Sequence, residues 1–325
     1  MTGAPAIRPA REDDLPRLLD LHRRVFGRPV SAGERRWKLA GQPAPVANVW
    51  VAEIGGRVVA QYAGIPVRVR HRGREAWAVQ TVEAMTEPEQ RRRGLISQIS
   101  AAAFASWRRA GVAYRFGLPN RYWNARADAH GFLRVAELRW WVRWLDPARA
   151  FAARLGLDLP AGARAAPPTF GRSRGGPPLA PIADPAPLDD LWARTADEGV
   201  VRDAGWYRWR YREAPRPFEL LGAGSGSSLD GVIAFRAEAR SGTIAEVHGV
   251  EPRIVRRLLQ GACAELRSQG AVRAALLIQT GTPLEEQALA TGFLPRPHAF
   301  VVRALDLGGG LPRAARFQGG DFDVV

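Results

Sequence analysis

Short stretches of alternating apolar and polar residues recur through the first half of the chain, and such alternation predicts β-strands. The expected strands cover residues 5–8, 48–54, 57–65, 66–70, 75–85, 112–118 and 136–145. Apolar residues at helical spacing predict one helix directly after Asp13 and Asp14 and another over residues 92–109. Residues 120–130 predict a further short helix. The pattern as a whole predicts an α/β fold.

The same order of elements recurs in the second half. In the first half a helix ends at Gly111, and a strand, a helix and a Gly-Phe pair at 131–132 follow. In the second half a helix ends at Gly270, and a strand, a helix and a Gly-Phe pair at 292–293 follow. A further strand comes after each Gly-Phe pair. This recurrence predicts a tandem duplication of one α/β domain.

A segment rich in proline and glycine separates the two halves. Residues 160–187 contain eight prolines and four glycines and almost no apolar periodicity. A segment of this composition cannot bury enough apolar surface to offset its loss of conformational entropy. We therefore expect a first domain over residues 1–150, a linker over 160–187 and a second domain over 188–325.

The charge of the chain is strongly basic, with a formal net charge of +15 over 325 residues. Such a charge raises the question of a nucleic-acid partner. The arginines are nevertheless spread along the chain, Lys38 is the only lysine, and the sharpest cluster is Arg91–Arg93. We interpret the charge as a solvated basic surface and expect no nucleic-acid partner.

Several classes of protein are disfavoured by composition. The single Cys263 excludes internal disulfides and a cysteine-based zinc site, and the five histidines are not paired at metal-binding spacing. No uncharged apolar run approaches the roughly 18 residues of a membrane span. The N-terminal residues lack the apolar core of a signal peptide. We expect a soluble cytoplasmic protein without a bound metal; its oligomeric state is left open.

The segment over residues 79–99 combines a strand, a turn rich in arginine and glycine, and the start of a helix. The first N–H groups of a helix have no partner within the helix, and the helix dipole favours negative charge beside them. Gly94 permits close approach to the backbone, and Arg91–Arg93 add charged donors. The segment thus predicts a pyrophosphate site; an exposed turn with solvated arginines is the alternative.

The stretch Arg91-x-x-Gly94-x-Ile96, which follows a strand ending at Met85-Thr86, resembles the acyl-CoA-binding motif of the GNAT N-acetyltransferases. The family pattern is Gln/Arg-x-x-Gly-x-Gly/Ala, so Ile96 departs from it at the last position. The opening strand and helix over residues 7–26, and the strand–helix unit that ends at 131–132, are also similar to the family. The resemblance covers most of residues 5–145.

This resemblance implies two tandem GNAT-like domains, each with a mixed, mostly antiparallel sheet flanked by helices. The second would be a degenerate copy that shapes the substrate cleft. Counting back from Gly270 by the distance from Gly111 to Gly94 leads to Arg253, beside Pro252, where no glycine stands. We therefore expect acetyl-CoA to bind in the first half only.

The activity implied is transfer of an acetyl group from acetyl-CoA to a primary amine of a small molecule or peptide. Glu83 is the expected general base, although an exposed carboxylate paired with an arginine is the alternative. The family often places a tyrosine where Ala127 stands, so Tyr122 is the expected acid, with packing against Trp123 as its alternative. The residues expected to contact acetyl-CoA are Met85, Thr86, Arg91, Arg92, Arg93, Gly94, Leu95, Ile96 and Asn120.

Two other functions stay open at this point. One is a tandem-GNAT transferase that uses aminoacyl-tRNA, which the Arg/Gly segment argues against. The other is a non-catalytic acyl-CoA sensor, which Ala127 leaves open. The aromatic, basic run over residues 206–211 predicts either a helix that packs between the two domains, or an aromatic wall or stacking platform for a substrate. One interpretation of the acidic C-terminal stretch, FQGGDFDVV, is that it docks in a basic cleft.

Overall fold

The computed structural model describes residues 3–41, 44, 46–155, 179–195, 197–225 and 228–322, which form two compact units. The first unit consists of Met1–Val135, Glu198–Val200 and Val302–Ala315, and the second of Ala136–Asp197, Val201–Val301 and Arg316–Val325. Both units are built from strands and helices with mixed sheets, so the fold class is mixed α/β, as the sequence predicts.

The sheet of the first unit runs in the order β1-β2-β3-β4-β5, and the end of β13 pairs with β5. These strands are β1 (Ala6–Pro9), β2 (Val49–Ile54), β3 (Arg57–His71), β4 (Arg74–Thr86), β5 (Val112–Gly117) and β13 (Leu294–Asp306), with the short β8 (Gly199–Val200) beside β3. Neighbouring strands are antiparallel except for β4 and β5, which are parallel. The predicted strands at 57–65 and 66–70 are one continuous strand.

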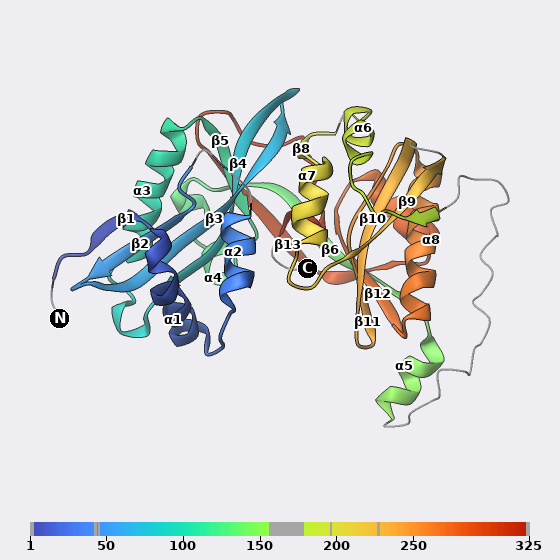
Figure 1. Ribbon diagram of the computed structural model, residues 1–325, viewed down its shortest axis with the longest axis horizontal. Coiled ribbons are helices and arrows are strands. Elements are labelled where there is room, and N and C mark those ends of the chain that lie inside the picture. The colour runs from blue at the N-terminus through green and yellow to red at the C-terminus, as the bar shows by residue number, and fades with distance from the viewer. Residues whose placement is uncertain are drawn as a thin grey trace. The chain divides into compact units, whose positions relative to one another are not determined.

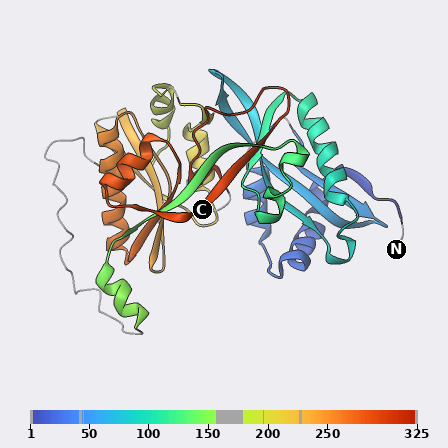
Figure 2. The same cartoon turned by 180° about the vertical axis from the view of Figure 1, so that it is seen from behind.

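Helices cover both faces of this sheet. The helices α1 (Leu15–Phe26) and α2 (Ala32–Ala40) lie on one face (Figure 1), and α3 (Leu95–Arg109) lies on the other (Figure 2). Alternation along β2 explains this arrangement, because Trp50 and Ala52 pack with α3 whereas Val51 packs with α1. The sheet therefore has one apolar core on each face.

Three local features of the first unit differ from the sequence prediction. The helix α3 begins at Leu95 rather than at residue 92, because Arg92 and Gly94 have φ angles of 63° and 69° and so interrupt helical geometry. The stretch 120–130 is split into α4 (Arg121–Asn124) and a 3-10 turn over Asp128–His130. The helix α2 was not predicted at all.

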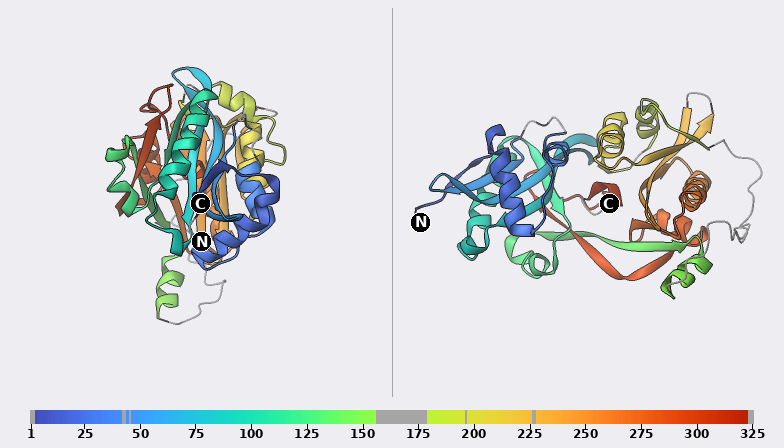
Figure 3. Two further views of the ribbon diagram at one scale, coloured as in Figure 1. Left: turned by 90° about the vertical axis from the view of Figure 1, so that its left-hand side faces the viewer. Right: turned by 60° about the horizontal axis from the view of Figure 1, so that its bottom comes forward.

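The sheet of the second unit runs in the order β6-β12-β11-β10-β9-β7. Its elements are β6 (Leu133–Trp144), β7 (Leu179–Pro181), β9 (Glu219–Ser225), β10 (Ser228–Glu238), β11 (Ser241–Gly249), β12 (Arg273–Gln279), α5 (Pro147–Arg154), α6 (Leu188–Ala193), α7 (Ala204–Tyr207), a π-helical turn (Arg208–Arg212), α8 (Pro252–Ser268) and α9 (Pro283–Ala290). Here β11 and β12 are the parallel pair. The helices α7 and α8 lie on opposite faces of this sheet (Figure 3).

The units differ from the predicted domains in three places, one of which is that Glu198–Val200 belong to the first unit, because β8 pairs with β3. The chain enters the second unit after Val135 rather than near residue 150, because β6 pairs with β12. The last residues of β13 belong to the first unit, because they pair with β5. Of the predicted linker, residues 160–178 lie outside the described residues, and Leu179–Pro181 form β7 against β9.

The aromatic run at 206–211 packs inside the second unit around a buried carboxylate. Glu246 accepts hydrogen bonds from Tyr207 at 2.6 Å, from Tyr211 at 2.7 Å and from the Trp206 indole at 3.3 Å. Arg202 lies 3.1 Å from Glu246 and also donates to Asp321, so the buried charges are paired. This network accounts for the run as a packing element within the second unit, whereas the prediction placed it between the two domains, and it fixes the C-terminal segment over residues 316–322 to the second unit.

Candidate functional site

The parallel strands β4 and β5 diverge near their carboxyl ends. Their pairing stops at Gln80 and Phe116, whereas β4 continues along β3 as far as Thr86. A β-bulge interrupts β4 after the divergence: Val82 and Ala84 have partners in β3, and Glu83 between them has a φ of 21°. The result is a stretch of β4 whose second edge is no longer covered by β5.

The orientation of the backbone at this edge follows from the ladder. The N–H of Glu87 donates to the carbonyl of Val59 at 2.9 Å, and Thr86 faces Ala60. Hydrogen-bonded and non-bonded pairs alternate in an antiparallel ladder, so the N–H and carbonyl of Thr86 point away from β3. Consistently, that carbonyl accepts a bond from Arg91 Nε at 3.3 Å. Thr86, rather than Met85, therefore presents a backbone donor at the divergence.

The loop between β4 and α3 is fixed by ion pairs at its start and exposed to solvent at its end. The buried carboxylate of Glu87 pairs with Arg24 at 2.7 Å and also with Arg57. A 3-10 turn over Pro88–Gln90 follows, and the three arginines after it are exposed. The side chain of Arg93 donates to Gln90. The loop thus projects cationic side chains from a fixed base.

The N-terminus of α3 satisfies the requirements of an anion site. Gly94 is the N-cap residue and has no side chain to accept the first N–H groups, and the first turn contains no acidic residue. Gln98 N bonds to the Gly94 carbonyl, which leaves the N–H groups of Leu95, Ile96 and Ser97 without a partner in the helix. A Cβ placed on Gly94 would lie 3.9 Å from Gln98 Nε2, so the approach to this backbone is unobstructed.

Some of the expected contact residues can act only through their backbone. The side chains of Met85 and Leu95 are buried in the two cores, and Ile96 packs against the core under α3. Asn120 uses its side-chain oxygen to cap α4, accepting from the N–H groups of Tyr122 at 3.1 Å and Trp123 at 3.0 Å. The exposed side chains of the predicted set are therefore those of the three arginines and of Asn120.

The two residues expected to be catalytic have different surroundings. Tyr122 is 67% exposed, and its hydroxyl accepts a hydrogen bond from Arg121 at 2.6 Å. Ala127 is buried, so no acid stands at the position where the family often has a tyrosine. Glu83 is largely buried and bonds to Arg35 at 2.7 Å and to Lys38 at 2.8 Å. Both oxygens of the Glu83 carboxylate are thus engaged by cations.

These contacts set the proton affinity of Glu83. Burial alone would raise the pKa of its carboxyl group, but the charges of Lys38 and Arg35 and their hydrogen bonds outweigh burial and lower that pKa to about 2. A carboxylate with so low a pKa is a weak base. The surroundings favour a positioning role for Glu83 over the expected role of general base.

The partners of Glu83 come from α2, a helix that the sequence pattern did not reveal. The helix contributes Arg35 and Lys38, and Gln61 of β3 completes the group by bonding to the Glu83 carbonyl at 3.2 Å. A sequence signal for α2 exists: Ser31 and Glu34 have the spacing of a capping box, and Ser31 Oγ accepts from Glu34 N at 3.0 Å. This spacing locates the helix, although not its contact with β4.

Two kinds of feature are absent from the described part of the chain. Within the described ranges, no helix is long and apolar enough to cross a membrane. In the same residues, no three or more His, Cys, Asp or Glu side chains are grouped in a way that could hold a metal ion.

Comparisons with known proteins agree with this geometry. Residues 6–126 match the acetyltransferase (GNAT) domain family. No curated protein matches the chain significantly. Among solved structures, a probable N-acyltransferase from Enterococcus faecalis V583 is 14% identical, with a TM-score of 0.72 over 94% of this chain and 74% of that one. A GCN5-related N-acetyltransferase from Anabaena variabilis is 12% identical, with a TM-score of 0.67 over 94% and 73%.

A third structure, a GCN5-related N-acetyltransferase from Kribbella flavida, is 12% identical, with a TM-score of 0.64 over 93% of this chain and 70% of that one. At these identities the likeness concerns the fold. The family match covers β1 to α4, including the divergent strands, the bulge and the arginine loop. Residues 6–126, which contain the candidate site, therefore match the GNAT acetyltransferase domain family.

Proposed function

We propose that the chain is an acetyl-CoA-dependent N-acetyltransferase that acts on a primary amine of a small molecule or peptide. The observation that supports this most directly is the open N-terminus of α3, with Gly94 as its cap and three exposed arginines before it. Three unpartnered N–H groups suit the pyrophosphate of acetyl-CoA. Arg91, Arg92 and Arg93 add charge-assisted donors around it.

In this proposal the divergence of β4 from β5 receives the acyl end of the donor. The acceptor nitrogen attacks the thioester carbonyl carbon as the uncharged amine, and the carbon–sulfur bond then breaks to release the CoA thiolate. The proton that the nitrogen loses passes to solvent. The backbone N–H of Thr86 stabilises the negative charge that develops on the carbonyl oxygen. Glu83, held by α2, fixes the bulge that sets the direction of this N–H. Tyr122 is the proposed donor of a proton to the thiolate.

We propose that the second unit is a degenerate copy of the first. Its strands β10 and β11 carry a bulge at Ala245, and β11 then diverges from the parallel β12, as β4 does from β5. The start of α8 differs from that of α3, because Glu251 is its N-cap residue and Pro252 supplies no N–H. A carboxylate and a proline at this position disfavour a pyrophosphate.

A second feature of this copy also opposes acyl-CoA. The C-terminal segment lies between the divergent strands: the Gln318 side chain accepts from Val247 N at 2.9 Å and donates to Val247 O at 3.0 Å. The backbone of Gln318 forms a bridge with Ile278 of β12. The chain's own residues thus use the backbone groups that the divergence exposes.

The proposed activity can be tested by a screen of amine acceptors with acetyl-CoA, read out by the release of free thiol. Thiol release that depends on both an amine and an intact Arg91–Gly94 loop is expected. Binding of acetyl-CoA without transfer to any amine would favour the sensor function instead. Transfer from aminoacyl-tRNA but not from acetyl-CoA would favour the other tandem transferases.

We expect acetyl-CoA to bind once per chain. Calorimetry on the full chain should give a stoichiometry near one, because among the helices of the described residues only α3 begins with free N–H groups and no carboxylate. Arg92→Gln should weaken binding, whereas Arg253→Gln, which removes an exposed charge at the start of α8, should not. Two equivalent sites, or equal losses in the two variants, would contradict the assignment of the site to the first unit.

Tyr122→Phe should lower the acetylation rate without changing the affinity for acetyl-CoA, because the hydroxyl is exposed and bonds only to Arg121 among the described residues. General acid catalysis typically contributes about 10²-fold or more. Steady-state kinetics compare this variant with Trp123→Phe, which alters the adjacent ring without removing a proton donor. An unchanged kcat in Tyr122→Phe would remove the residue from the mechanism.

A further inference from the structure

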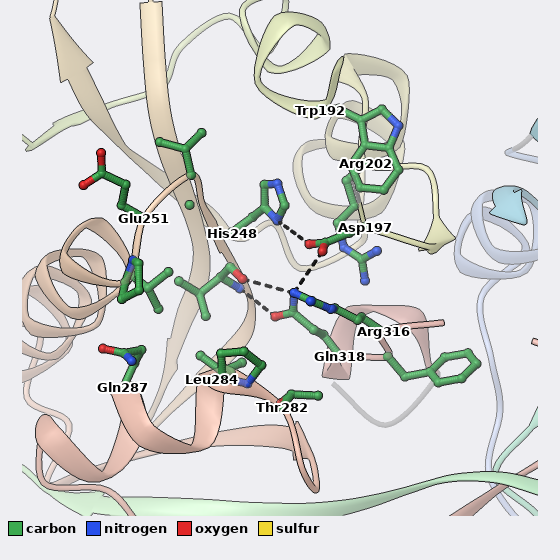
Figure 4. Close-up of a pocket in the computed structure, with 17 residues that line it drawn as sticks. Trp192, Asp197, Arg202, His248, Glu251, Thr282, Leu284, Gln287, Arg316 and Gln318 are labelled. Atoms are coloured by element: carbon green, nitrogen blue, oxygen red, sulfur yellow. Dashed lines mark hydrogen bonds and ion pairs between the residues drawn. The ribbon is translucent and has the colours of Figure 1, made fainter. Parts of the chain in front are cut away.

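The second unit contains a cavity of about 270 Å³ at the point where β11 and β12 diverge (Figure 4). Pairing between these strands ends at Ile244 and Leu276. The end of β11, the first turns of α8 and α9, and the C-terminal segment enclose the space beyond. The cavity belongs entirely to the second unit and has no part in the proposed acetyl-CoA site.

The walls of the cavity are largely apolar. The apolar side chains that line it include those of Trp192, Val255, Leu284 and Phe317. The Trp192 ring lies 6.0 Å from the imidazole ring of His248. Sites for small organic molecules combine such a lining with a few placed polar groups. The volume suits a molecule of about one substituted ring.

His248 is a polar residue of the cavity that has a buried nitrogen without a hydrogen-bond partner among the described residues. Its side chain is 8% exposed, and its Nδ1 lies 3.9 Å from Asp197. Its other ring nitrogen, Nε2, is buried and has no hydrogen-bond partner among the described residues. Figure 4 shows one ring nitrogen on the side of Asp197 and the other turned away from it. A buried polar atom left without a partner costs about 1–3 kcal/mol.

The surroundings of His248 indicate which chemistry would satisfy it. The carboxylate of Asp197 favours the proton on the adjacent Nδ1, so Nε2 presents a lone pair. Burial, together with the charge of Arg202, lowers the pKa of His248 to about 4, so the ring is neutral near neutral pH. Asp197 itself pairs with Arg316 at 2.9 Å. The charges at this end of the cavity are therefore already compensated.

We propose that this cavity binds a small uncharged molecule with a flat apolar body and one hydroxyl or N–H group, which donates a hydrogen bond to His248 Nε2. The apolar body lies against Trp192 and Leu284. Thr282 and Gln287 line the same cavity and can bond to a second polar group. An anion or an ammonium group binds less well, because entering the cavity leaves its charge without a free counter-charge.

The test uses the full chain with three probes that share one ring: benzyl alcohol, benzoate and benzylamine. Nitrogen-15 labelling of histidine gives few imidazole signals to resolve, because the chain has five histidines. His248→Phe identifies the signal of His248. Benzyl alcohol should shift that signal saturably and bind at least tenfold more tightly than the charged probes. The exposed His298 is the internal control and should not shift.

A second variant tests whether the shift of the His248 signal requires binding within the cavity. Leu284→Trp fills the cavity without altering His248, and it should abolish the shift caused by benzyl alcohol. The proposal is overturned if no probe shifts the His248 signal, if benzoate or benzylamine binds as tightly as benzyl alcohol, or if the shift persists in Leu284→Trp. None of these readouts depends on acetyltransferase activity, so failure of the proposed function would not produce them.

Discussion

Replacing Gly94 with alanine is expected to weaken acetyl-CoA binding by about 10- to 100-fold, because hydrogen bonds to a charged group contribute about 1.5–3 kcal/mol each. A methyl group at this position lies beside the first N–H groups of α3, to which the pyrophosphate binds in the proposed site. The methyl group finds space within the protein itself, since its nearest neighbour would be Gln98 Nε2 at 3.9 Å. Calorimetric titration with acetyl-CoA measures the loss.

The backbone at Gly94 has a φ of 69°, so alanine also introduces strain of about 1 kcal/mol there. Gly111 is the matched control, because it lies beyond the other end of α3, has a φ of 76° and has open space where a Cβ would lie. Gly111→Ala should lose a similar amount of stability and retain its affinity for acetyl-CoA. Equal affinities in the two variants would show that the loop is only a connector.

The sequence was sufficient to predict strands β1 to β5 and the apolar face of α3, because both depend on periodicity within one segment. Leu95, Ile99, Ala103 and Trp107 are buried together as the helical spacing predicts. The partners of β6 and β13 could not be predicted in the same way. Alternation shows which face of a strand is apolar, but it does not specify the strand beside it.

In the candidate site, too, features within one segment were predictable from the sequence, whereas contacts between distant segments were not. The arginine loop and Gly94 are contiguous, so their chemistry was visible in the sequence. The setting of Glu83 depends on Arg35, which is 48 residues away, and on Lys38, which is 45 residues away. The spacing of apolar residues within a segment does not predict a contact between residues so far apart in the sequence. The bulge at Glu83 likewise interrupts the alternation from which its orientation was inferred.

Replacing Glu83 with glutamine should lower the acetylation rate by about 10²-fold, the scale of a small misplacement of reacting groups. The loss should be the same at every pH between 5 and 9, because the pKa of Glu83 is about 2 and the carboxylate stays ionised throughout. Steady-state rates across this range, with acetyl-CoA affinity measured alongside, test the prediction. A loss that shrinks as pH rises would instead identify Glu83 as the general base.

Stability provides a second readout of the same cluster. The folded-state pKa of Glu83 lies below its usual value of 4.5, so its ion pairs stabilise the fold above pH 4.5 and lose this effect as pH falls toward 2. Glu83→Gln should therefore lower the free energy of unfolding at pH 7 by about 3 kcal/mol, and the difference should vanish in acid. Glu53→Gln, which breaks a half-buried pair with Arg8 away from β4, should leave the acetylation rate unchanged. If it lowers that rate equally, the effect of Glu83 is general loss of stability and not control of the bulge.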